Sequence, residues 1–318
     1  MDRIERSVIV PADLAGRRLD QAAALLLPEF SRSRLKTWID AGRLTIAGRS
    51  ARARMLLKGG EQLELKAELA AAVEVAPEAI PLAVVHEDDA LLVIDKPVGL
   101  VVHPGAGNRS GTLQNALLHA YPELAPLPRA GLVHRLDKDT SGLLLVARTL
   151  ASQKTLAAAL ERREIRRTYQ AICQGALTGG GSVDAPIGRH PRERTRMAVV
   201  DGGREARTRY RVLERFRAHT HCEIDLETGR THQIRVHMAH VRAPLVGDPV
   251  YGGRPRLPPR PTEALRAALQ SFRRQALHAT RLALEHPGSG DELELESPLA
   301  PDLRALLEAL RADAAAAR

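Results

Sequence analysis

The stretch that decides how this chain is interpreted is His134-Arg135-Leu136-Asp137-Lys138-Asp139-Thr140-Ser141-Gly142. Its first eight residues carry five ionisable side chains, and the apolar run Leu143 to Ala147 follows directly. Because an unpaired charge is costly to bury, these side chains must pair, face solvent or line a cleft. If the stretch is extended, Arg135, Asp137 and Asp139 share one face, since side chains alternate along a strand. The stretch therefore predicts a charged cleft beside a buried strand.

Two further segments place polar groups next to apolar runs. Asp95-Lys96-Pro97 follows the strand-like run Leu91 to Ile94, and an ordinary exit from a strand explains it equally well. The strand-like segment Arg167 to Ile172 carries Tyr169. A single tyrosine in a strand is more often part of the core than of a catalytic site.

A fourth segment, Gly229 to Met238, begins as a turn and continues into sequence that suits either a helix or a strand. Its histidines do not have the His-Glu-x-x-His spacing of a zinc site, and no cysteine is close. Arg230 and Arg235 instead suit contacts with phosphate or carboxylate groups. We therefore expect no metal in this protein.

The composition limits the class of protein. The 318 residues are 44% hydrophobic, enough for a sizeable core, and the net charge of +9 fits either a solvated surface or a polyanionic partner. Two cysteines in unrelated contexts suggest a reducing compartment. No signal peptide is visible, and no apolar run approaches the roughly 20 residues that span a bilayer. We expect a cytoplasmic protein without a membrane segment.

Residues 17 to 65 read as a small α/β unit. Helices are expected over 17–27 and 32–41, the second capped by Ser31, and strands are expected at 43–46 and around Leu63 and Leu65. Most charge runs are solvated helix faces, but here only Asp40 opposes a cluster of like charges, which favours an anionic partner. The cluster includes Arg32, Arg34, Lys36 and Arg43.

The remaining chain alternates strand-like and helix-like runs, which indicates a mixed α and β domain without fixing its topology. Residues 66 to 80 look like a linker, so the boundary is expected between residues 75 and 76. Helices are expected over 156–164, 263–277 and 302–312, the last one fraying into the alanine-rich C-terminal tail.

Taken together and in this order, the motifs resemble the RluA/RluD group of pseudouridine synthases, and the preceding small domain is typical of the RluD type. The resemblance rests on His134 to Gly142, on Gly229-Arg-Thr-His-Gln-Ile-Arg-Val-His237, on Pro244 to Gly252 and on His278 to Leu282. It implies an α+β fold for residues 76–318, with a mixed, largely antiparallel sheet, flanking helices and a central cleft. Residues 1–75 would form a small RNA-binding domain, similar to one shared by a ribosomal protein and some tRNA synthetases.

The resemblance also implies the chemistry and the residues that perform it. Uridine in RNA is isomerised to pseudouridine without a cofactor, and Asp137 is the catalytic carboxylate, either as a nucleophile or by removing a sugar proton. Arg235 would be its ionic partner, and Tyr169 would stack on the uracil. Contacts with the RNA are expected from Arg135, His134, Arg230, His232, Arg32, Arg34, Lys36 and Arg43.

The expected substrate is large-subunit ribosomal RNA, and a monomer is the simplest assembly. Close relatives act on other ribosomal sites and on tRNA, so the sequence does not identify the target uridine. Two other functions compete: a non-catalytic RNA-binding assembly factor, and a hydrolase that uses Asp137 and Asp139 as a carboxylate pair. The concentration of charge at residues 134–141 argues against the first, and carboxylates two residues apart rarely span a scissile bond.

Overall fold

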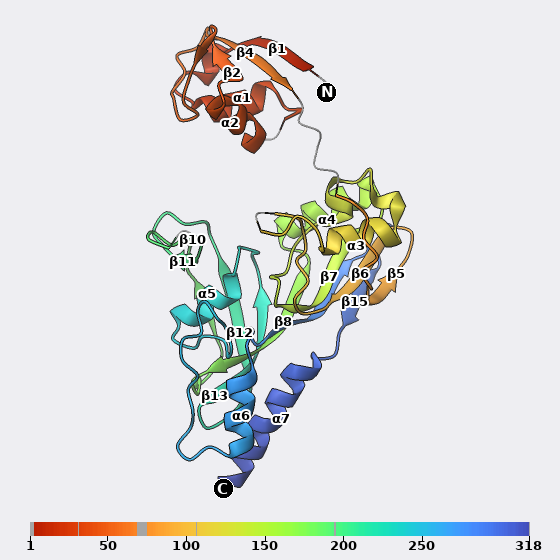
Figure 1. Ribbon diagram of the computed structural model, residues 1–318, viewed down its shortest axis with the longest axis vertical. Coiled ribbons are helices and arrows are strands. Elements are labelled where there is room, and N and C mark those ends of the chain that lie inside the picture. The colour runs from red at the N-terminus through yellow and green to blue at the C-terminus, as the bar shows by residue number, and fades with distance from the viewer. Residues whose placement is uncertain (1–2, 31, 69–74, 106, 194, 318) are drawn as a thin grey trace. The chain divides into compact units, whose positions relative to one another are not determined.

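In the computed structural model, the chain divides into two compact units, Met1–Glu74 and Val75–Arg318, each with its own hydrophobic core (Figure 1). The structure describes residues 3–30, 32–68, 75–105, 107–193 and 195–317. Ser31, the predicted cap of the second helix, lies outside the described residues, as does part of the predicted linker.

The first unit is a small sheet with two helices packed on it. The sheet is antiparallel, with the strand order β1 (Arg3–Ile9), β4 (Gln62–Glu68), β2 (Leu44–Ile46), β3 (Arg49–Ser50). Helices α1 (Leu19–Leu26) and α2 (Arg32–Asp40) turn their apolar faces inward, where Leu19, Leu35 and Ile39 are buried together with Leu63 and Leu65.

The second unit is built on one long mixed sheet. Its strand order is β5 (Val84–Glu87), β6 (Leu91–Lys96), β7 (Ser141–Ala147), β14 (Leu277–Glu285), β8 (Arg166–Gln174), β13 (His219–Leu226), β12 (Arg207–Arg215), β9 (Gly181–Asp184), and β15 (Glu292–Glu296) pairs with β14. Every pair is antiparallel except β7 with β14, which run parallel over two residue pairs. The predicted α+β class with a largely antiparallel sheet is confirmed.

Helices flank this sheet, and a short hairpin of β10 (Ile187–Arg189) and β11 (Met197–Val199) stands apart from it (Figure 1). The helices are α3 (Leu113–Ala120), α4 (Leu150–Arg162), α5 (Gln233–His240), α6 (Glu263–Ser271) and α7 (Pro301–Ala316). None of the helices in the described ranges is both long and apolar enough to cross a membrane.

Three of the predicted helix ends were wrong. The helix expected to begin at Leu156 already begins at Leu150, where the hydroxyl of Thr149 accepts from the amide of Ser152 and caps the helix. The helix expected over 263–277 ends at Ser271, because Leu277 and Ala279 are needed in strand β14, where their side chains enter the main core. The C-terminal tail does not fray: α7 continues to Ala316. Alanine has the highest helix propensity, and buried Asp313 ties this last part of the helix to Arg217 and to the start of α6.

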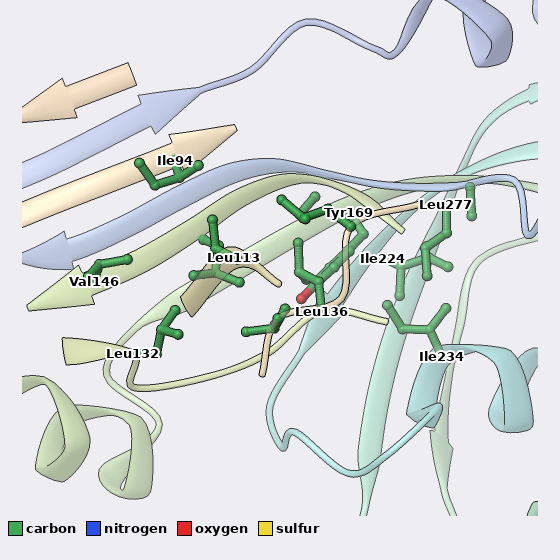
Figure 2. Packing of buried hydrophobic residues seen from close by; sticks show 14 of the residues in the cluster. Ile94, Leu113, Leu132, Leu136, Val146, Tyr169, Ile224, Ile234 and Leu277 are labelled. Carbon is green, nitrogen blue, oxygen red and sulfur yellow. The ribbon is translucent and has the colours of Figure 1, made fainter. Parts of the chain in front are cut away.

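Strands β6 and β7 contain the continuous apolar runs 91–94 and 143–147 because both faces of these runs are covered. Leu92, Ile94 and Val146 enter one core cluster, whereas Leu91 and Leu145 enter another on the opposite face. Figure 2 shows the first of these clusters, which continues along the sheet to Tyr169, Leu136 and Leu277. Strand β7, which is buried on both faces, therefore anchors the loop of residues 132–140 that precedes it.

Gly142 lets β7 start directly beside β14. Its φ is +110°, and a Cβ atom at this position would lie 2.2 Å from the carbonyl oxygen of Ala279. Only glycine can adopt this conformation with so close a neighbour. The residue thus fixes the point at which the charged loop joins the sheet.

Candidate active site

Residues 134–139 form a loop and not the extended strand that the alternation of charges allowed for. Leu136 is buried in the core while Arg135 beside it is exposed, and a turn follows in which the amide of Thr140 donates to the carbonyl of Asp137 at 3.1 Å. This turn lifts Asp137 away from the core and into a pocket.

Buried Lys96, at the end of β6, holds the loop through its main chain. The Lys96 ammonium has no exposed surface and donates to the carbonyl oxygens of Pro97 at 2.7 Å, Leu100 at 3.0 Å and Lys138 at 3.0 Å. Burial lowers the pKa of Lys96 to about 8, although the charges of Asp139 and Asp137 oppose that change. Three carbonyl acceptors satisfy all three donors of the ammonium.

The far end of the loop is fixed from strand β14 and the residues before it. Arg274 donates from Nη1 to the carbonyl of Asp139 at 3.3 Å, and Gln275 donates from Nε2 to the hydroxyl of Thr140 at 3.0 Å. Asp302 forms two contacts of 2.7 Å with the Arg274 guanidinium and so orients it. The position of Asp137 is therefore set by contacts with the backbone of the two residues that follow it.

Arg235 of α5 joins two carboxylates. Its Nη1 donates to Oδ2 of Asp137 at 3.0 Å, while Nε and Nη2 donate to the two oxygens of Asp248 at 2.7 and 2.9 Å. Asp248 also accepts from the amides of Val250 and Tyr251. Such a two-point contact fixes the guanidinium in the plane of the Asp248 carboxylate and leaves Nη1 to meet Asp137.

The neighbouring charges shift the pKa values of Arg235 and Asp248 in opposite directions. Burial alone would lower the pKa of Arg235, but the hydrogen bonds and charges of Asp248, followed by those of Asp137, raise it above the usual value. Burial alone would likewise raise the pKa of Asp248, but Arg235 and the two amides hold it below the usual range. The group therefore carries a permanent cation beside Asp137.

His232 and Tyr251 close the other side of the Asp137 carboxylate. Nε2 of His232 lies 3.9 Å from Oδ1 of Asp137, and its Nδ1 lies 2.9 Å from the hydroxyl of Tyr251, which accepts from the amide of Met197. Burial lowers the pKa of His232 although Asp137 opposes the change, so the ring is neutral at pH 7. The guanidinium carbon of Arg235 also lies over the Tyr251 ring, 5.1 Å from the centre of the ring.

Tyr169 forms the apolar wall of the same pocket. It comes from β8, is only 5% exposed and packs with Leu136 and Leu277, as Figure 2 shows. Burial raises the pKa of its hydroxyl, with Arg167 opposing and Asp137 reinforcing the change. The pocket around it, about 360 Å³ including its open mouth, is lined by Asp137, Arg235, His232, Arg230, Arg135 and other residues.

Two of the residues expected to bind RNA also have contacts within the protein. Nε2 of His134 accepts from the amide of Leu145 at 3.0 Å, and burial, followed by the charges of Arg167 and His103, lowers the pKa of His134 to about 3. Arg230 donates from Nε to the carbonyl of Glu205 at 2.9 Å. By contrast, Arg135 is exposed at the mouth of the pocket.

The four expected RNA-binding residues of the first unit are all exposed. Arg32 also forms a salt bridge of 2.6 Å with buried Asp20, which Arg18 contacts as well. Lys36 pairs with Asp40 on the same helix, and the guanidinium of Arg34 lies 6.0 Å from the centre of the Trp38 ring. Asp20 and Asp40 thus offset part of the positive charge of α2.

Sequence reasoning gave no role to Asp248 or Lys96, although both lie in segments that it singled out. The signal for Asp248 was a single carboxylate inside the apolar run from Leu245 to Val250, since such a group must find a cation when it is buried. For Lys96 the signal was a lysine at the end of a strand that is buried on both faces. In neither case does the sequence identify the partner.

One cluster outside the site has a composition that suits a metal. His86, Asp88 and His286 approach one another, with both Nε2 atoms near Oδ2 of Asp88 at 2.6 and 3.0 Å. However, Nδ1 of His286 accepts from the amides of Gly288 and Ser289. The proton of a neutral His286 therefore lies on Nε2 and points at Asp88 as a hydrogen bond, which leaves Nε2 without a lone pair for a metal.

Comparison with known proteins shows a consistent relationship. Residues 90–240 match the family model described as RNA pseudouridylate synthase. The chain is 55% identical over its whole length to the ribosomal large subunit pseudouridine synthase D of Xanthomonas campestris pv. campestris and covers 96% of that protein. It is 56% identical over 98% of its length to the protein of that name from Pseudomonas aeruginosa, with 98% of that protein covered.

The fold comparison agrees with the sequence comparison. A structure of human RNA pseudouridylate synthase domain containing 4 matches 72% of this chain and 93% of its own length, with a TM-score of 0.56 and 27% identity. The resemblance expected from the motifs is confirmed by these matches.

Proposed function

The chain belongs to the RNA pseudouridylate synthase family, and we propose that it isomerises uridine in large-subunit ribosomal RNA, with Asp137 as the catalytic carboxylate. The observation that supports this proposal best is the contact between Asp137 and Arg235, made inside a pocket that Tyr169 lines. The substrate is proposed from the names of the bacterial relatives, which are more than half identical to this chain over nearly all of its length.

The reaction breaks the bond between N1 of uracil and the ribose C1′, turns the base and rejoins it through C5, so the atoms of substrate and product are the same. Arg235 places a cation 3.0 Å from Asp137 where water is partly excluded, and both attack on C1′ and removal of a sugar proton require a negatively charged carboxylate. Asp248 fixes the guanidinium, and because two carboxylates share one cation, the three groups together carry one net negative charge.

The walls of the pocket suit a base removed from its helix. Tyr169 offers a flat apolar surface on which uracil can stack, and Arg135 at the mouth can occupy the space that the base leaves. Extruding a base costs about a few kcal/mol, which such contacts must offset. His232 is neutral beside Asp137, so it can donate or accept a hydrogen bond without competing for the carboxylate charge.

We further propose that residues 1–75 bind RNA beside the target, using the exposed cations of α2 and Arg43. This binding would weaken as salt rises, because cations bound to RNA are released on complex formation. Action on ribosomal RNA in the cytoplasm and a monomeric enzyme remain predictions.

Replacing Asp137 with Asn tests the catalytic assignment. The variant should form no pseudouridine in large-subunit ribosomal RNA transcripts while it binds them as the wild type does, because the charge lost is the reacting one. Pseudouridine mapping on the transcript and a filter-binding titration measure the two properties.

Asp139→Asn is the matched control, since Asp139 is the next carboxylate in the loop and contacts the framework through its main chain. Full activity of Asp137→Asn would overturn the assignment. Release of free uracil by the wild type would favour the hydrolase, and unchanged RNA would favour a protein that only binds.

A further inference from the structure

Among the described residues, Arg167 is a buried cation without a counter-ion. It lies on β8 two residues before Tyr169, so both side chains project from the same face of the sheet. Only 7% of Arg167 is exposed, and its Nε has no hydrogen-bond partner within the described ranges. No carboxylate of the described chain forms a salt bridge with its guanidinium.

The other buried arginines of the described chain have what Arg167 lacks. Arg235 pairs with Asp248 and Asp137, and Arg274 pairs with Asp302. An uncompensated buried charge carries a large free-energy cost, which a ligand of opposite charge can offset when it binds. An arginine kept in this state beside a reaction centre indicates that its partner arrives with the substrate.

The surroundings of Arg167 leave space for such a partner. It lines a pocket that also contains Asp137, Tyr169 and Arg230, so this pocket adjoins the one that holds the reacting carboxylate. Gly229 forms part of the wall, and a Cβ atom there would lie 2.9 Å from Nη1 of Arg167. The absence of a side chain at residue 229 therefore keeps the guanidinium in place and accessible.

The charge of the pocket points to an anion. Arg135, Arg167 and Arg230 line it together with two carboxylates, Asp137 and Glu161, and Asp137 is already paired with Arg235. Glu161 lies in the exposed last turn of α4 and forms no ion pair with Arg167. The pocket thus retains a surplus of positive charge next to a site that takes an RNA nucleotide.

We propose that Arg167 binds a phosphodiester of the RNA immediately next to the target uridine, and so anchors the flipped nucleotide by its backbone. This inference rests on the proposed function, because it assumes RNA in the neighbouring pocket. A guanidinium matches two phosphate oxygens at once, which fixes orientation as well as position. Arg167 is therefore assigned as a binding residue that holds the sugar of the target over Asp137.

The test uses an RNA stem-loop that carries the uridine mapped for this enzyme. The two linkages flanking that uridine are replaced, one at a time, by an uncharged methylphosphonate joined to a 2′-deoxy sugar, because a neighbouring 2′-hydroxyl would cleave the linkage. An RNA with the same 2′-deoxy sugar but normal phosphates is the control. For the wild type, one of the two replacements should lower kcat/KM by about 10- to 100-fold, the effect of losing a hydrogen bond between charged groups.

The Arg167→Gln variant, tested on the normal and the modified RNA, completes a double-mutant cycle between this side chain and the phosphate. It should lower kcat/KM on the normal RNA by about the same factor, and the sensitive methylphosphonate should then cause no further loss. Without RNA, this variant should melt at or above the temperature of the wild type, because it removes an unpaired buried charge. If Arg167 had a purely structural role, the Arg167→Gln variant would melt at a lower temperature than the wild type, and the methylphosphonate would still lower its kcat/KM.

Two further variants probe the neighbours of the Arg167 guanidinium. Gly229→Ala should reduce kcat/KM in the wild type but not in the Arg167→Gln background, since its Cβ acts by displacing the guanidinium. Glu161→Gln should leave the melting temperature unchanged and should not lower kcat/KM, because it removes a negative charge from a pocket that binds an anion. If Glu161→Gln reproduces the effects of Arg167→Gln, Glu161 is the true partner and the inference falls.

The outcomes separate this inference from the proposed function. If the wild type forms no pseudouridine in any RNA, the proposed function fails. If it forms pseudouridine but tolerates both methylphosphonates, or if the losses from Arg167→Gln and the methylphosphonate multiply, only the role of Arg167 is overturned.

Discussion

Arg235 and Arg167 both line the space around Asp137 and are almost equally buried, yet their electrostatic surroundings are opposite. Arg235 has two carboxylates and a tyrosine ring around it, whereas Arg167 has an open pocket and the bare backbone of Gly229. The difference suggests a division of labour. The protein itself supplies the counter-ions of Arg235, whose position must be set before RNA binds. Under our proposal, the RNA supplies the counter-ion of Arg167, so this contact forms only when RNA is bound.

The largest effect that would test this contrast is expected from Asp248→Asn. The change leaves the Arg235 guanidinium buried with one charged partner, so the free energy of unfolding should fall by about 3 kcal/mol, the lower end of what a broken buried ion pair costs. Urea denaturation measures the loss.

Asp302→Asn is the control for that experiment, because it removes the partner of Arg274 at a carboxylate that is 47% exposed. Solvent screens such a pair, and a loss of only about 1 kcal/mol is expected. Equal losses for the two variants would mean that burial does not distinguish the pairs, and the contrast between Arg235 and Arg167 would lose its basis.

A smaller effect should appear in the dependence of stability on pH. The folded protein holds the pKa of Asp248 below its value in the unfolded chain, which is about 3.9. The stabilisation from this group is therefore complete above pH 4 and is lost as the pH falls through the folded pKa. The stability difference between wild type and Asp248→Asn should narrow as the pH falls below about 4 in urea titrations; a constant difference would contradict the ionic role of Asp248.

The smallest effect is expected from Tyr251→Phe. The ring under Arg235 remains, but the hydroxyl that contacts His232 and the amide of Met197 is removed, at a cost of about 1 kcal/mol. We expect kcat to fall a few-fold while RNA binding is retained. Tyr251→Leu, which also removes the ring, should cost more; equal effects would show that the ring contributes nothing to the position of Arg235.

Much of the fold followed from local patterns in the sequence. The continuous apolar runs marked β6 and β7, and the charges at residues 134–139 marked a cleft beside β7, although these residues form a loop and not an extended stretch. The order of the strands did not follow, because β14 joins β7 and β8 across more than a hundred residues of chain. The length of α7 was underestimated because an alanine-rich end looks the same whether or not a buried Asp313 anchors it.

The site was predictable to the extent that its motifs are contiguous. Asp137, Tyr169 and Arg235 were named from motifs, and the structure brings them to one pocket, while their catalytic roles remain predictions. The second partner of Arg235 was missed because Asp248 becomes its neighbour only after a turn that follows α5. The isolation of Arg167 could not be seen at all, since the lack of a partner is a property of the folded chain.

Lys96, Arg274 and Gly99 hold the Asp137 loop at its carbonyl oxygens, which every amino acid possesses. The identity of the exposed side chain at residue 138 is therefore separated from the placement of Asp137. Such an arrangement uncouples mutation from geometry: residue 138 can be exchanged while the carboxylate of Asp137 stays where it is.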